Sequence, residues 1–154
     1  MIYSLVTTMT RAQKAAIFMA LDVVTMAAAL ILAHALVMPG PAGMSGLSPL
    51  LLLLVPLGTV TGHWLGLPRI RLNAFDLTSA LRCAALAGTL GLAGWIVAPD
   101  LAPGMPGGVP AVFAVLLTVM MVAGRMALRA LTVQVYRQGR ARRRVLIYGA
   151  GRTG

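Results

Sequence analysis

Four long apolar blocks, separated by short polar or Pro/Gly-rich segments, dominate the hydrophobic pattern of the chain. The blocks cover residues 15–37, 47–67, 77–97 and 111–136. Each has the length that a membrane-spanning helix needs, about 20 mostly apolar residues for a hydrocarbon core ~30 Å thick. Because backbone groups cannot stay unpaired in lipid, blocks of this kind are expected to be helices. The pattern predicts an all-α membrane protein with a four-helix transmembrane region over residues 1–136.

Proline and polar residues predict where these helices begin and end. Ser48 can cap the second helix and Pro49 can occupy its first turn, where proline is tolerated. Pro56 lies inside the same block and predicts a kink, because proline removes one backbone hydrogen bond. Asp76 is placed to cap the third helix, and Pro99 follows its expected end.

Composition agrees with a chain that lies in lipid. Hydrophobic residues make up 59% of the 154 residues and charged residues 10%, with a mean hydropathy of +0.89. A soluble domain has about 45–50% apolar and about 25% charged residues. The balance excludes an ordinary soluble fold.

The positive charges predict the orientation. They occur in the N-terminal arm, in the loop after the second block, and in a basic linker over residues 137–143, whereas the loops at 38–46 and 98–110 contain no Lys or Arg. Short loops rich in Lys and Arg remain in the cytoplasm. We therefore expect both termini on the cytoplasmic side of the membrane. The same charges should bind anionic lipid headgroups. This topology accounts for the net charge of +10, so nucleic acid is not an expected partner.

A cleaved signal peptide is the alternative for the first block. Ala33-His34-Ala35 resembles a cleavage site. However, the block exceeds the 7–15 apolar residues of such a peptide, which favours a retained helix.

Asp22 is an acidic residue well inside the first block, at a depth of roughly 10 Å from the helix rise. A lone carboxylate in lipid is costly and usually has a partner. Arg125 and Arg129 lie one turn apart on the fourth helix at a comparable depth, and Arg82 on the third helix is a further candidate. We expect a structural ion pair between Asp22 and Arg125; the alternative is that Asp22 extends toward the interface.

The other reactive side chains predict no metal or disulfide chemistry. Cys83 is the only cysteine, so an internal disulfide cannot form. His34 and His63 are expected near opposite membrane surfaces and cannot share a metal. Both are interpreted as interfacial residues.

Small residues recur on the third block at four-residue spacing. They are Ala80, Ala84 and Gly88, with Gly91 and Gly94 beyond. Such spacing lets helix backbones approach closely in lipid. It predicts packing within the bundle, with a homo-oligomer interface as the alternative.

The last eleven residues, 144–154, have a different character. Residues 144–148 read as a short buried strand, and Gly149, Gly151 and Gly154 follow it as a G-x-G-x-x-G turn. This arrangement is typical of the first strand and phosphate-binding turn of a Rossmann-like α/β domain. The chain ends before the helix that would hold a phosphate, so the candidate cofactor site is incomplete, and we expect a fragment of a longer protein.

Together these features resemble a known family. Four N-terminal spans, Gly66-Leu-Pro-Arg69 after the second span, and the basic lead into "RRVLIYGAGRTG" (Arg143–Gly154) look like the membrane-anchored, CapD-like polysaccharide-biosynthesis proteins. These are nucleotide-sugar 4,6-dehydratases and epimerases. Pro68 departs from the family, which usually has tyrosine there. The membrane region of WbaP-like polyprenyl-phosphate sugar-1-phosphate transferases is the alternative resemblance, and a non-enzymatic membrane module is a third possibility.

The resemblance implies a function that this chain cannot perform alone. It implies a cytoplasmic enzyme, anchored to a bacterial plasma (inner) membrane, that uses NAD(P) to convert a UDP-sugar for capsule, O-antigen or other surface polysaccharide. It also implies that the "VLIYGAG" unit is accessory and that no catalytic residue lies within these 154 residues.

Overall fold

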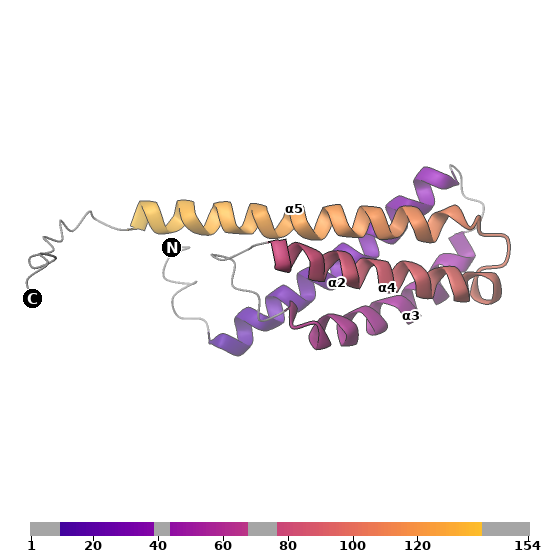
Figure 1. Ribbon diagram of the computed structural model, residues 1–154, viewed down its shortest axis with the longest axis horizontal. Coiled ribbons are helices and arrows are strands. Elements are labelled where there is room, and N and C mark those ends of the chain that lie inside the picture. The colour runs from indigo at the N-terminus through magenta and orange to yellow at the C-terminus, as the bar shows by residue number, and fades with distance from the viewer. Residues whose placement is uncertain (1–9, 39–43, 68–76, 140–154) are drawn as a thin grey trace, which may run out of the picture.

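The computed structural model describes residues 10–38, 44–67 and 77–139, and within these ranges the regular structure is helical (Figure 1). Helix α2 covers Arg11–Val37 and α3 covers Met44–Trp64. Helix α4 covers Leu77–Leu101 and α5 covers Gly108–Gly139. The four predicted helices are therefore present. The expected strand at 144–148 and the glycine turn after it lie outside the described residues.

Helix α2 begins earlier than the apolar block because its N-terminus is capped. The Thr10 hydroxyl accepts a hydrogen bond from the Gln13 backbone N–H (3.3 Å), and the Gln13 side chain accepts one from the Thr10 N–H (2.9 Å). This reciprocal capping box satisfies two backbone donors that the helix leaves unpaired. The helix therefore starts at Arg11, four residues before the expected position.

The predicted ends of α3 are wrong on both sides. The helix starts at Met44, so Ser48 is not its cap and Pro49 lies inside it. It stops at Trp64 rather than at Leu67, because Gly66 adopts a positive φ of 71° and its N–H bonds to the His63 carbonyl at 3.0 Å. A left-handed glycine is a common helix stop, since it has no Cβ to clash.

Two further boundaries differ from the sequence expectation. Helix α4 continues through Pro99 to Leu101, and the Ala102 N–H still bonds to the Ala98 carbonyl at 2.9 Å. A proline so near the end of a helix removes one hydrogen bond without ending it. Helix α5 starts at Gly108, which puts Pro110 in its first turn, where an N–H has no partner to lose. The expected cap at Asp76 lies outside the described residues.

The helices run alternately up and down, and each packs against its neighbours in a ring. The packed pairs are α2–α3, α3–α4, α4–α5 and α2–α5, and in the described residues the backbones of diagonal pairs do not approach one another. Helices α2 and α4 begin at the end of the bundle where α3 and α5 end (Figure 1). We call this the basic end, because Arg82, Arg125 and Arg129 lie toward it, and we call the opposite end the distal end.

Small residues let α4 approach its neighbours, although not on the face that the spacing suggested. Gly91 lies against α5, where an added Cβ would be 2.7 Å from the Ala114 Cβ, and Gly94 lies against Pro110. Gly88 faces outward, with nothing within 4 Å of an added Cβ. The buried face thus follows the helical repeat through Cys83, Ala87, Gly91, Gly94 and Ala98. The prediction of packing within the bundle is confirmed for Gly91 and Gly94 but is wrong for Gly88.

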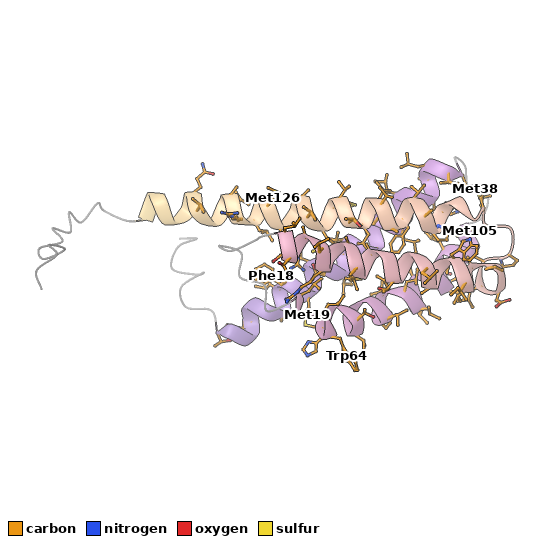
Figure 2. The ribbon with its side chains drawn as sticks, in the orientation of Figure 1. Phe18, Met19, Met38, Trp64, Met105 and Met126 are labelled. Atoms are coloured by element: carbon orange, nitrogen blue, oxygen red, sulfur yellow. The ribbon has the colours of Figure 1, made fainter. Side chains whose placement is uncertain are left out.

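Large apolar side chains cover the outside of the bundle as well as its core (Figure 2). Leu50, Phe113 and Leu117 are buried, whereas Leu52 is 82% exposed and Trp64 87% exposed. A continuous apolar surface of this kind is unfavourable in water. It is the surface that a helix bundle presents to lipid.

Candidate functional site: a buried ion pair at the basic end

Arg125 on α5 and Asp22 on α2 form an ion pair inside the bundle. The Arg125 Nη2 donates to both carboxylate oxygens of Asp22, at 2.9 and 3.2 Å. The side chains are only 9% and 18% exposed, respectively. The ion pair expected from the sequence is therefore present, and Asp22 does not extend alone toward the interface.

Arg125 also bonds to a third element that the sequence did not reveal. Its Nη1 donates to the backbone carbonyl of Leu67 at 3.2 Å, in the turn that follows α3. Carbonyls at the end of a helix have no partner within the helix and carry partial negative charge, so a guanidinium is a favourable donor there. The one feature of the sequence that could have indicated this contact is Gly66, because a glycine that ends a helix leaves unpaired carbonyls nearby. Arg125 thus connects α5 with its neighbour α2, and also with the turn after α3 on the opposite side of the ring.

The remaining basic side chains near this site are exposed. Arg129 lies one turn further along α5 and faces outward. Arg82 is also exposed, and its Nη1 lies 3.7 Å from the position that a Cβ on Gly66 would occupy. Neither replaces Arg125 as the partner of Asp22. The selection is geometric: of these three arginines, only Arg125 faces the interior of the bundle.

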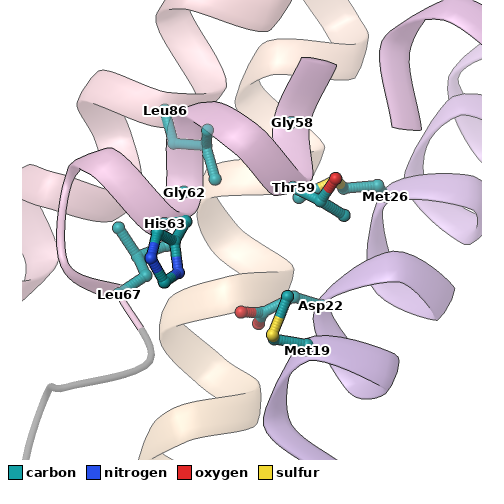
Figure 3. A pocket seen from close by; sticks show the side chains of 9 residues that line it. All are labelled: Met19, Asp22, Met26, Gly58, Thr59, Gly62, His63, Leu67 and Leu86. Carbon is teal, nitrogen blue, oxygen red and sulfur yellow. The ribbon is translucent and has the colours of Figure 1, made fainter. Parts of the chain in front are cut away.

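A small hollow lies next to the ion pair (Figure 3). It has a volume of about 20 Å³ and is lined by residues of α2 and α3, with Leu67 and Leu86 beside them. Its polar lining residues are Asp22, Thr59 and His63. Gly58 and Gly62 on α3 also border it, because they carry no side chains that would fill the space.

The two histidines and the cysteine do not contribute a reactive centre. His63 lies in the last turn of α3 at the basic end, and His34 in the last turn of α2 at the distal end, so the predicted separation is correct. His34 lies at the end of its span but is buried rather than open to the surface, since it is only 4% exposed and its Nε2 has no hydrogen-bond partner among the described residues. It is covered where α2 packs against its neighbours. Cys83 is buried in α4.

Within the described residues, no group of three or more His, Cys, Asp or Glu side chains is arranged to hold a metal ion. The candidate cofactor residues Gly149, Gly151 and Gly154 lie outside those residues. The chemistry present in the bundle is therefore an internally neutralised charge pair. Such a pair fixes helices against one another, because separating its members leaves a charge unpaired in a medium of low polarity.

The fold and this site define the class of protein. Each of the four helices is long and apolar enough to cross a membrane, with candidate spans at Ala16–Val37, Gly46–Trp64, Leu77–Leu101 and Gly108–Leu131. A bundle of this kind is typical of a multi-pass membrane protein. Comparison with known proteins gave no match to this chain among family models, curated proteins or solved structures.

Proposed function

We propose that this bundle is the membrane anchor of a cytoplasmic nucleotide-sugar dehydratase or epimerase that acts in surface polysaccharide biosynthesis. The proposal combines the four spans with the glycine-rich sequence at residues 149–154 and the family resemblance of the chain. In this proposal the enzyme binds NAD(P) and a UDP-sugar in a domain that follows the bundle. The bundle holds that domain at the inner membrane, beside anionic headgroups.

The observation that carries the proposal is the length of α5. The apolar span ends at Leu131, but the helix continues to Gly139. Eight further residues extend about 12 Å at the rise of an α-helix. Figure 1 shows α5 projecting past the other three helices at the basic end. A helix that leaves the membrane in this way is suited to carry a folded domain clear of the lipid surface, and the glycine-rich sequence begins ten residues after its end, at Gly149.

The bundle itself supports an anchoring role rather than a catalytic one. Its charged interior residues neutralise each other. A site that binds even a small organic ligand measures roughly 300–1,000 Å³, so the hollow of about 20 Å³ beside the ion pair is too small for a sugar. A larger hollow, of about 600 Å³, lies around the connection between α4 and α5 at the distal end, away from the side proposed to be cytoplasmic. The chemistry of the proposed function therefore belongs to the domain after α5.

The proposed orientation can be tested with single cysteines in a Cys83→Ala background. Pro103→Cys lies exposed in the connection between α4 and α5, and Gln134→Cys lies exposed on the α5 extension. In intact cells a membrane-impermeant maleimide should label the first and should label the second only after permeabilisation. The reverse pattern would place the basic end outside and contradict a cytoplasmic domain.

The enzymatic part is tested by the sequence encoded after Gly154 and by the activity of the complete protein. The dehydratase proposal expects a second glycine-rich motif and a Tyr-x-x-x-Lys pair there. Membranes containing that protein should convert a UDP-linked amino sugar to a 4-keto-6-deoxy product, detected by mass spectrometry. The matched control replaces the tyrosine of the pair by phenylalanine. A re-entrant helix with an Asp-Glu pair would indicate a sugar-phosphate transferase instead, and neither feature would leave a free-standing membrane module.

A further inference from the structure

The hollow beside the ion pair has the size and the polar groups of a water site. Its volume of about 20 Å³ exceeds the ~10–15 Å³ of accessible space that one water molecule needs. It lies between α2 and α3, and the side chains of Met19 and His63 on its border are exposed near the basic end. The hollow can therefore exchange its contents with the exterior at that end.

The groups around the hollow complement the hydrogen-bonding capacity of water. Both oxygens of Asp22 accept from the same nitrogen of Arg125, which leaves further lone pairs on the carboxylate. The Thr59 hydroxyl donates to the Pro56 carbonyl at 2.7 Å, so its oxygen remains free to accept. His63 can supply either a donor or an acceptor from its ring. Water in the hollow can donate to the polar oxygens of Asp22 and Thr59 and can accept from His63, and a buried water usually makes about three such bonds.

Gly62 keeps this space open. A Cβ added there would lie 3.7 Å from the Leu86 Cδ2 and 4.0 Å from the Leu67 Cδ2, which is ordinary van der Waals distance. The residue is therefore not needed for close packing of helices, unlike Gly58, whose added Cβ would lie 2.6 Å from the Met26 Sδ. The space beside Gly62 is therefore available to a small polar ligand, because no helix contact depends on it.

We propose that the hollow between α2 and α3 is a water site that connects the Asp22–Arg125 ion pair with the aqueous phase at the basic end. Water at this position hydrates the carboxylate and lowers the cost of burying the charge, which is otherwise several kcal/mol per ion. The ion pair is then in contact with water from one side of the membrane, rather than isolated from water within the bundle.

The test is the access of water to a cysteine placed at the hollow, in a Cys83→Ala background. Transfer to D₂O exchanges a thiol proton only where water reaches the thiol, so Thr59→Cys should convert S–H to S–D, seen as a shift of its infrared stretching band, at least about tenfold faster than Val60→Cys. Val60 is the matched control, because it is the next residue of α3 and its side chain is 58% exposed on the lipid-facing surface. Complete exchange in both variants after denaturation in detergent confirms that each thiol is intact.

A second change separates water in the hollow from general looseness of the bundle. Adding Gly62→Ala to Thr59→Cys should slow the S–H to S–D exchange by partly filling the hollow, whereas adding Gly88→Ala, in open space on α4, should not. Equal rates for Thr59→Cys and Val60→Cys, or a rate that Gly62→Ala leaves unchanged, would overturn the proposal. If Thr59→Cys does not fold, Gly62→Cys takes its place against the same control, and the same inequality in rate is required.

Discussion

Replacing Arg125 by glutamine should destabilise the bundle by about 3–5 kcal/mol, the cost of breaking a buried ion pair by removing one partner. The change leaves the Asp22 carboxylate without its counter-charge and the Leu67 carbonyl without its donor. Both interactions are lost together, because the single Arg125 side chain connects α5 with α2 and with the turn after α3. The measurement is reversible unfolding in mixed micelles with increasing SDS, followed by circular dichroism.

Arg129→Gln is the matched control, because Arg129 lies one turn away on α5 and is exposed. It should change the free energy of unfolding by no more than about 0.5 kcal/mol, as exposed substitutions usually do. If Arg125→Gln is no more destabilising than Arg129→Gln, the ion pair does not hold the bundle together.

The partner residues also predict the outcome of a charge swap. Asp22→Arg combined with Arg125→Asp should be more stable than either single variant, because opposite charges again face each other. Recovery should be incomplete, since an aspartate at position 125 cannot donate to the Leu67 carbonyl. A swap less stable than both single variants would show that the two charges do not interact.

Replacing Gly91 by leucine should separate α4 from α5 and cost at least about 1–3 kcal/mol, the usual penalty of overpacking a core. Even the first atom of a side chain has no room, because it would lie 2.7 Å from the Ala114 Cβ and 3.2 Å from the Pro110 carbonyl oxygen. One of these obstacles is backbone, so a change of rotamer cannot relieve the clash. The same unfolding measurement applies.

Gly88→Leu is the control for this second effect. It makes the same change three residues away on α4, where an added Cβ meets nothing within 4 Å. A leucine there points to lipid and should leave stability unchanged or slightly improved, because glycine is a poor helix former. Equal destabilisation by the two variants would mean that α4 does not pack through Gly91.

The sequence predicted the helices well because their cause is local. A run of apolar residues long enough to cross lipid must pair its own backbone groups, whatever surrounds it. The boundaries were less predictable, because they depend on single hydrogen bonds. The Thr10–Gln13 capping box lengthens α2, and the positive φ of Gly66 shortens α3. The capping box could be recognised in the sequence as a T-x-x-Q pattern. The end of α3 could not, because nothing in the sequence says which of several glycines turns the chain.

The ion pair shows how far the sequence reaches into the site. A carboxylate deep in an apolar block requires a partner, and few cations lie at its depth, so Asp22 and Arg125 could be paired from the sequence. The third member, the Leu67 carbonyl, could not be named, because backbone groups carry no signal of residue type. The hollow beside Gly62 was equally hidden, since a space is defined by several helices at once.

By itself, the sequence determined that the chain has four helices long and apolar enough to cross a membrane, that their basic ends should lie on one side, and that one acidic residue inside them needs a basic partner. These follow from the energetics of lipid, which act on each segment separately. Only the tertiary structure decided which face of α4 is buried, which arginine turns inward, and where α3 stops so that the Leu67 carbonyl in the following turn meets Arg125. These depend on how the four helices rotate and pack against one another, and a pattern along the chain does not contain that information.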